Sequence, residues 1–388
     1  MGKREFYNRL LFLRARLPPP ARFPSLSVKF FPAAEKWGFM NSLERVAAAL
    51  GHTEADYVPV CPILAGITRK LTGAAYPEWS QNAEVCAEAF LKAAETFDLD
   101  CIVTLIDLSV ECDAWGQKIV YPEDEAAHPD YSQCVVTDID GYASIKKADY
   151  RDSQRMMMHI DVCRRLVDEL NGKKPVVAFV FGPLGVLSML RSQQELFLDL
   201  YDDIDAVKAA AREINETLKE YVSALIKTGV SAIMLDTLYA SGSIMSKEMW
   251  DEAEGVLVEE LADHIRAEGG VVMLHNCGKR IYFDTQIKRM RPTAISFLYP
   301  PDDCADFAEC KEKYGREVTL IGCVTPANAI CGTDEEWDAE CRSMIDAFAK
   351  EGGFILATGC EYPANASFER AERMIEIAKT YGRYSPEK

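Results

Sequence analysis

Two short segments of the sequence carry side chains that bind zinc well. Residues 273–278 include His275 and Cys277, and residues 359–361 include Cys360. Residues two apart in a β-strand project to the same side, so His275 and Cys277 would point together if their segment is a strand. One imidazole and two thiolates form a donor set of catalytic zinc sites, which keep a fourth position open. The three residues are therefore predicted to bind one zinc ion, provided that the fold brings both segments together.

Cysteine usage provides the alternative to this prediction. The chain has 13 cysteines, an odd number, and no Cys-x-x-Cys pair. Such usage is typical of a reducing cytoplasm, where most cysteines pack in the core as small hydrophobic residues. Core packing of Cys277 and Cys360, with His275 satisfied by a hydrogen bond, is therefore the competing interpretation. The position of all three at the ends of apolar runs favours the metal site, because barrel enzymes place their chemistry at strand ends.

The donor set also indicates what the metal would do. Two thiolates and an imidazole leave Zn²⁺ with no net charge, which makes it a weak Lewis acid toward water but a good host for a thiol. Alkyl transfer to a thiol is the expected reaction, and hydrolysis, which needs a general base near the metal, is the competing one. Glu361 follows Cys360 directly. It is expected either to fill the fourth zinc position when substrate is absent or to be an exposed loop carboxylate.

The elements that would position these residues are short apolar runs separated by longer helical patterns. Near-continuous apolar character is typical of parallel strands buried on both faces. Eight such strands alternating with helices predict an α/β fold of the (β/α)₈ TIM-barrel type, with one long excursion over residues 116–149 after the second strand. The runs are 58–64, 101–106, 176–182, 231–236, 271–277, 294–300, 319–325 and 354–360.

Further polar residues and a glycine at the predicted strand ends are candidates for binding the substrate. Asp236 ends the fourth run, where a carboxylate tends to be functional and loop capping is the alternative. Asp107 and Glu111 follow the second run and face the same end, with capping of a helix or turn as the alternative. Gly182 ends the third run, where it would either open room for a ligand or make the turn.

Charge and length limit the classes of partner. The 388 residues have a formal net charge of −18, and a chain this acidic repels the phosphate backbone of nucleic acids. No apolar run approaches the roughly 18 residues that a membrane span needs. Residues 1–39 differ, with eight Lys/Arg, two Asp/Glu and three consecutive prolines. They are expected to form an extension outside the core (a targeting peptide, a docking arm or a stretch upstream of a start at Met40), and residues 40–388 to form one catalytic domain.

From Met40 onward the chain resembles the uroporphyrinogen decarboxylase superfamily, and within it the corrinoid-dependent methyltransferases typified by methylcobamide:coenzyme M methyltransferase. The His-x-Cys pattern followed by a late cysteine is the specific part of the resemblance. The matching segments are residues 43–50, 58–60, 107–111, 114–116, 182–184, 275–278, 332–333 and 359–365.

This resemblance implies a TIM barrel in which His275, Cys277 and Cys360 bind a zinc ion that activates the thiol of a methyl acceptor. It also implies a methylated corrinoid as the donor, carried by a separate corrinoid protein that docks on the barrel mouth. The small-molecule acceptor would be a thiol such as coenzyme M, or another acceptor such as tetrahydrofolate.

Two other functions stay open at this point. One is decarboxylation of a tetrapyrrole of the uroporphyrinogen type. The decarboxylases of the superfamily carry an Arg-Gln-Ala-Gly-Arg-type segment after the first strand and lack the zinc residues, whereas residues 61–69 here contain Arg69 as their single arginine. The other is a non-catalytic protein that binds a corrinoid or tetrapyrrole partner.

Overall fold

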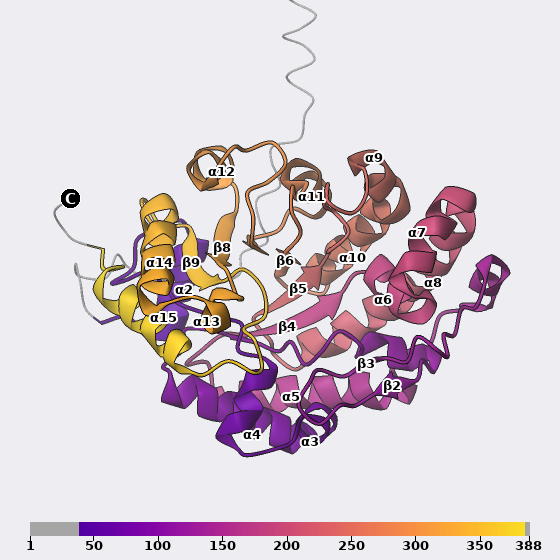
Figure 1. Cartoon of the computed structure of the whole chain (residues 1–388), viewed down its shortest axis with the longest axis horizontal. Helices are drawn as coiled ribbons and strands as arrows, with labels where there is room; N and C mark the ends of the chain where they lie inside the picture. Colours follow the sequence, from indigo (N-terminus) through magenta and orange to yellow (C-terminus); the bar gives the residue numbers. More distant parts are fainter. Residues whose placement is uncertain (1–38, 385–388) are drawn as a thin grey trace, which may run out of the picture. The chain divides into compact units, whose positions relative to one another are not determined.

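A curled, all-parallel sheet of seven strands forms the centre of the computed structural model, which describes residues 39–384. Each strand pairs with the next central strand along the chain, in the order β1-β4-β5-β6-β7-β8-β9 (Figure 1). The residues of these strands are buried throughout, as the apolar runs predicted. The strands are β1 (Ile102–Val103), β4 (Val176–Phe181), β5 (Ala232–Asp236), β6 (Val272–Asn276), β7 (Ala294–Phe297), β8 (Thr319–Val324) and β9 (Phe354–Thr358).

The first predicted strand, residues 58–64, is present only as isolated bridges. Val60 pairs in parallel with Leu356 of β9, and Ile63 pairs with Glu361 just beyond it. On its other side, the carbonyl of Val60 accepts a hydrogen bond from the amide of Asp100 (3.1 Å). The prediction of a continuous strand is wrong because Pro59 and Pro62 have no N–H to give to a ladder. The segment nevertheless lies between β9 and β1, so the eighth position of the barrel is filled and the TIM-barrel-type fold is confirmed.

A buried ion pair fixes this closing segment to its neighbours. Asp100 accepts a hydrogen bond from the amide of Val60 (3.0 Å) through one carboxylate oxygen and from Arg45 (2.5 Å) through the other. Arg45 belongs to α2 (Ser42–Leu50), whose first turn carries a capping box between Asn41 and Glu44. One carboxylate therefore connects the first helix, the closing segment and the start of β1.

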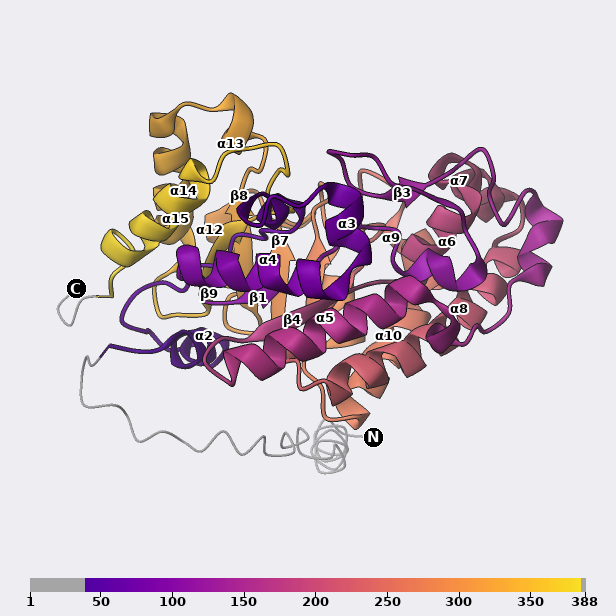
Figure 2. The same ribbon diagram turned by 90° about the horizontal axis from the view of Figure 1, so that it is seen from below.

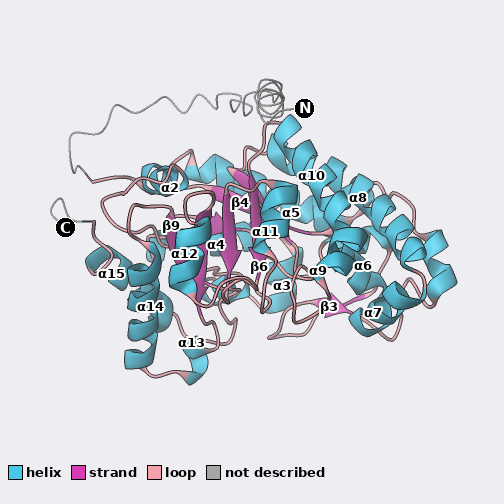
Figure 3. Cartoon of the chain, turned by 90° about the horizontal axis from the view of Figure 1, so that it is seen from above, coloured by secondary structure: helices cyan, strands magenta, loops and turns pink. Residues whose placement is uncertain are grey.

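Helices surround the strands on the outside of the sheet (Figure 3). The helices α4 (Ala83–Thr96) and α5 (Gln154–Leu170), which flank β1 in sequence, lie side by side, and α14 (Asp334–Phe348) and α15 (Glu369–Thr380) pack together beside β9 (Figures 1 and 2). The remaining helices of the described residues are α3 (Tyr76–Gln81), α6 (Pro183–Arg191), α7 (Gln193–Asp202), α8 (Ile204–Lys227), α9 (Lys247–Trp250), α10 (Val256–Ala267), α11 (Phe283–Met290), α12 (Phe307–Tyr314) and α13 (Asn328–Cys331).

The excursion predicted for residues 116–149 follows β1. It contains a short antiparallel pair, β2 (Ile119–Val120) with β3 (His128–Pro129), and the 3₁₀ turn Ile139–Ser144. No helix among the described residues is long and apolar enough to cross a membrane. Apart from Phe39, the extension predicted for residues 1–39 lies outside the described residues, so that part of the domain division stays a prediction.

Candidate metal and substrate site

The three side chains predicted to bind zinc meet at the C-terminal ends of β6 and β9. The ligand atoms of His275, Cys277 and Cys360 all lie within 4.8 Å of one another. His275 is within the end of β6, Cys277 follows that strand directly, and Cys360 comes two residues after β9. Zinc bonds of about 2.0 Å to nitrogen and 2.3 Å to sulfur place tetrahedral ligands roughly 3.5–3.8 Å apart. These residues therefore fit a zinc ion after small side-chain adjustments, with a fourth position left for another donor.

Contacts among the three donors shift the pKa values of the two cysteines in opposite directions. Hydrogen bonding by Cys277, and then by His275, holds the pKa of Cys360 well below its usual range although burial opposes this. The contact with Cys360, together with burial, raises the pKa of Cys277. Burial is the largest effect on His275 and disfavours its charged form, but the hydrogen bond to Cys360 and the charges of Cys360 and Asp236 together raise the pKa of His275. Zinc requires deprotonated ligands, so its binding would release the protons that remain.

Ser296 holds His275 in an orientation that suits a metal ligand. The two residues are register partners on β7 and β6, and both are buried. The Ser296 hydroxyl lies 3.0 Å from Nδ1 of His275. A partner on Nδ1 fixes the ring and leaves Nε2 for the metal, which is how protein sites commonly set the tautomer of a histidine ligand.

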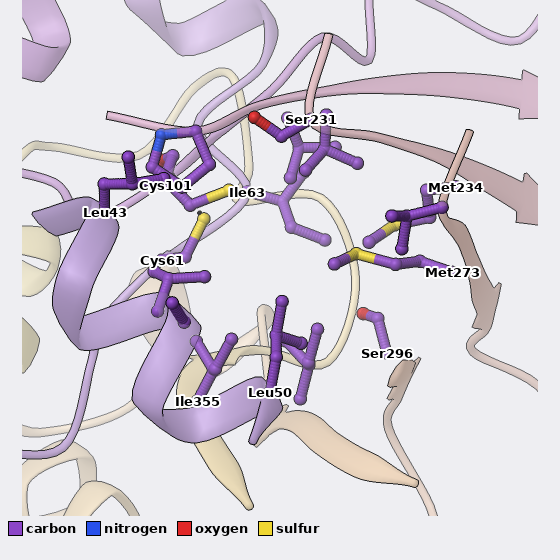
Figure 4. A pocket seen from close by; sticks show the side chains of 17 residues that line it. Leu43, Leu50, Cys61, Ile63, Cys101, Ser231, Met234, Met273, Ser296 and Ile355 are labelled. Atoms are coloured by element: carbon purple, nitrogen blue, oxygen red, sulfur yellow. Dashed lines mark hydrogen bonds between the residues drawn. The ribbon is translucent and has the colours of Figure 1, made fainter. Parts of the chain in front are cut away.

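An apolar cavity of about 100 Å³ lies in the barrel interior toward the strand starts, with Ser296 at its edge (Figure 4). Met234, two residues before Asp236 on β5, and Met273, two residues before His275 on β6, line it, and α2 closes it with Leu43 and Leu50. A buried water molecule needs several polar hydrogen-bond partners, and the lining of this cavity is almost wholly apolar. The cavity therefore offers no replacement partner for the His275–Ser296 contact.

Asp236 lies beside the metal ligands, in register with His275 on the neighbouring strand. It is 6% exposed, and its Oδ1 has no hydrogen-bond partner. Burial raises the pKa of Asp236 to about 7, while His275 lowers it and Cys360 raises it. The prediction that Asp236 faces the strand-end site agrees with this position, and its role in binding substrate stays a prediction.

Asp107 is held by other protein groups. Arg155, near the start of α5, forms a buried bidentate ion pair with it, with one contact at 2.9 Å. The amide and hydroxyl of Ser109 also donate to Asp107 at 2.9 and 2.7 Å. Its neighbour Glu111 accepts from the amide of Phe181 (3.1 Å), and burial raises the pKa of Glu111 to about 7. The Ser109 contact agrees with the turn-capping alternative for Asp107, and a role of Asp107 in binding substrate stays a prediction.

Gly182 makes room for a protein carboxylate. A Cβ at this position would lie 2.7 Å from Oε1 of Glu254 and 3.0 Å from the carbonyl of Asp236. Glu254 is buried and accepts from the amide of Leu184 (3.0 Å) and from Nε1 of Trp250 (2.8 Å). Burial raises the pKa of Glu254 to about 7. Direct ligand contact at Gly182 stays a prediction.

Glu361 lies outside the three-donor group. Its carboxylate accepts a hydrogen bond from the amide of Gly66 at 3.5 Å. Burial, and then the negative charge of Cys360, raise the pKa of Glu361 to about 8. It is therefore not an exposed loop carboxylate, and its use as a fourth zinc ligand stays a prediction.

Sequence reasoning missed three residues that shape this site. Ser296 is the one polar residue in the apolar sequence of β7, and this break in the pattern could have indicated a polar contact inside the barrel. Arg155 gives no signal, because an arginine in the first turns of a long helix is usually exposed. Glu254 lies in a π-helical turn, Asp251–Gly255, which changes the direction of side chains relative to an α-helical pattern.

Comparison with known proteins identifies the family. The model of the family described as uroporphyrinogen decarboxylase (URO-D) matches residues 41–381. The chain belongs to this family. A uroporphyrinogen decarboxylase from Wolinella succinogenes is 21% identical over 320 residues, which cover 80% of this chain and 89% of the relative. The uroporphyrinogen decarboxylase of Escherichia fergusonii is 22% identical over 293 residues, covering 72% and 78%.

Among solved structures, the chain is similar to a methyltransferase from Methanosarcina mazei. The TM-score is 0.75 at 21% identity, over 88% of this chain and 99% of that one. This similarity establishes the fold. The named relatives thus carry the names of two different enzymes, a decarboxylase and a methyltransferase.

Proposed function

We propose that this member of the URO-D family is a zinc-dependent methyltransferase that moves a methyl group from a methylated corrinoid protein to a small-molecule thiol. The observation that carries the proposal is the meeting of one imidazole and two cysteine sulfurs within 4.8 Å at the strand ends. This donor set suits a thiol better than water, because its two thiolates already neutralise the metal.

The roles of the residues follow from their contacts. His275, Cys277 and Cys360 would hold the zinc, and Ser296 would keep His275 in orientation through Nδ1. A zinc ion held there would supply a Lewis acid that lowers the pKa of the acceptor thiol. The protein would then present that thiolate at the open end of the barrel, where a partner protein can reach it.

The methyl transfer itself is a displacement at carbon. The thiolate sulfur attacks the methyl carbon of methyl-Co(III) corrinoid, the S–C bond forms as the Co–C bond breaks, and the electron pair stays on cobalt as Co(I). The thiol proton leaves to solvent. This displacement is chemically the same for coenzyme M (2-mercaptoethanesulfonate) and for other small thiols, and tetrahydrofolate, which would accept the methyl group on nitrogen, is the alternative acceptor.

Metal analysis and a spectroscopic assay test the proposal together. The purified protein should contain about one zinc per chain. Cys360→Ala should lose it, whereas Cys331→Ala, at an exposed cysteine outside the donor group, should keep it. Zinc-loaded protein should demethylate methylcob(III)alamin with a thiol, followed by the cobalamin absorbance, and Cys360→Ala should not.

Tetrapyrrole decarboxylation is the second candidate, because the curated relatives carry that name. Two observations weigh against it. Arg69 is the single arginine of the segment where the decarboxylases have several, and it contacts the exposed Asp124 (3.3 Å). Asp107 is occupied by Arg155. Decarboxylation of uroporphyrinogen without demethylation of methylcobalamin, or a wild-type protein that binds no zinc, would refute the methyltransferase proposal.

A further inference from the structure

We propose that the acceptor thiol carries a positively charged N–H group, such as a primary ammonium, and that Asp236 is the residue that binds it. This inference names the substrate class of the site and rests on the proposed function. It separates ammonium-bearing thiols from thiols that carry a sulfonate or carboxylate.

The Asp236 side chain points into the barrel, on the same face of the sheet as His275. Residues paired in a parallel register project to the same face of a sheet, and Phe181, Asp236, His275 and Ser296 are successive partners across β4 to β7. Because the His275 ring lies among the zinc donors, the carboxylate of Asp236 faces the same interior from the adjacent strand.

One carboxylate oxygen of Asp236 lacks a hydrogen-bond donor among the described residues. Oδ1 of Asp236 is buried and accepts no hydrogen bond, although a buried polar atom without a partner is costly. The nearby donors are occupied: Glu111 receives the amide of Phe181, Glu254 receives the amide of Leu184, and Ser296 contacts His275. A donor supplied by the substrate would satisfy this oxygen next to the metal.

The positively charged side chains in the described part of the protein do not offer a partner for an anionic substrate group beside Asp236. Among the residues that the structure describes, the buried arginines are each paired with an aspartate, and no lysine is buried. Of these pairs, Arg155–Asp107 lies at the mouth, and Arg69 stacks over Tyr76 while contacting Asp124. The cations that follow Cys277 in sequence, Lys279 and Arg280, are exposed.

A short thiol has little freedom once its sulfur is fixed. In a two-carbon thiol, the second functional group lies within a few bonds of the sulfur, so it must stay among the buried groups around the metal. Close to the metal ligands lie the buried Asp236 and the partly buried Glu361, and a sulfonate there would face carboxylates while the buried arginines are already paired. An ammonium at the same place would form a charge-assisted hydrogen bond with Asp236.

Three thiols of equal chain length make the test direct: 2-aminoethanethiol, 2-mercaptoethanol and 2-mercaptoethanesulfonate. Their binding to the zinc-loaded protein is measured by isothermal titration calorimetry, and sulfur–metal contact by the absorption spectrum of the Co(II)-substituted protein. The amine should bind roughly ten-fold or more tightly than the alcohol, in keeping with a hydrogen bond to a charged group, and the sulfonate should bind most weakly.

Two variants test whether Asp236 causes the preference for the amine. Asp236→Asn keeps the shape of the side chain but removes the carboxylate, and should abolish the preference for the amine over the alcohol. Glu111→Gln replaces another buried acid, whose carboxyl group already accepts a hydrogen bond from the amide of Phe181, and should keep the preference. Zinc content and circular dichroism establish that each variant is folded, and the wild-type ranking stands as a test even if one is not.

The outcomes separate this inference from the proposed function. If all three thiols change the cobalt spectrum and bind equally, or if the sulfonate binds best, the inference is overturned and the methyltransferase proposal stands. If Glu111→Gln loses the preference as fully as Asp236→Asn, the assignment to Asp236 is overturned. If no thiol changes the cobalt spectrum, the proposed function itself fails.

Discussion

Replacing Ser296 by alanine removes the hydroxyl that contacts Nδ1 of His275 at 3.0 Å without touching a metal donor. When Nε2 binds zinc, Nδ1 must carry the proton and therefore needs an acceptor. In the variant, this N–H would face an apolar cavity of about 100 Å³, where water finds too few partners to replace the hydroxyl. The metal-free ring can change tautomer or rotate, so most of the loss falls on the zinc-bound state.

Two estimates of how much zinc affinity Ser296→Ala loses agree with each other. An unsatisfied buried donor costs about 1–3 kcal/mol. Loss of an outer partner of a metal ligand typically lowers affinity 10–100-fold, which corresponds to about 1.4–2.7 kcal/mol. Zinc should therefore bind Ser296→Ala roughly 10–100-fold more weakly than the wild type, while the stoichiometry at saturating zinc stays the same.

The assay is competition for zinc with a chromophoric chelator. Ser296→Thr keeps a hydroxyl on the strand and should retain most of the affinity. Ser231→Ala alters a residue of the same cavity lining that has no contact with His275, and should behave as the wild type. An affinity of Ser296→Ala within two-fold of wild type would refute the argument that Nδ1 depends on this hydroxyl.

Three further predictions concern the acids around the site. Arg155→Met leaves Asp107 buried without its ion-pair partner and should lower the free energy of unfolding by about 3–5 kcal/mol in urea denaturation; a loss under about 1 kcal/mol would contradict the buried pair. Gly182→Ala places a Cβ 2.7 Å from the carboxylate of Glu254 and should destabilise the fold by about 1–3 kcal/mol, whereas an unchanged urea midpoint would contradict that close approach. Because burial raises the pKa of Glu111 from 4.5 to about 7, the folded protein keeps a proton that the unfolded chain has released, so stability should fall as pH rises between these values. Thermal midpoints across this range should flatten in Glu111→Gln, and an unchanged slope would exclude Glu111 as the cause.

The strand ends of the site were predictable because their residues are tied to a repeated pattern. Each apolar run marks a strand buried on both faces, and parallel strands bring their C-terminal ends to one edge. His275 and Cys277 follow from the two-residue period of β6, and Cys360 follows from the end of β9. A short local pattern therefore sufficed to predict that three residues from two distant segments meet.

The partners of the acids were not predictable in the same way. Arg155 reaches Asp107 from a helix 48 positions later, and Glu254 reaches Leu184 over 70 positions. Neither contact follows from periodicity, because each depends on how a helix packs on the sheet rather than on the order of strands. The prediction of a continuous first strand over residues 58–64 was wrong for a different reason. The apolar pattern predicts a strand, but Pro59 and Pro62 lack the amide N–H groups that a continuous ladder needs.

The position of the three donors also links the proposed metal to the closure of the barrel. The donors come from the ends of β6 and β9, which β7 and β8 separate in the sheet. Beyond β9, the next neighbour is the closing segment, which pairs only through the bridges at Val60 and Ile63. A ligand that binds the folded barrel and not the unfolded chain stabilises whatever arrangement presents its donors together. Zinc at this site would therefore fix the end of β9 from one side, while the proline-containing segment pairs with it from the other. The proposed function and the closure of the barrel would then depend on the same residues.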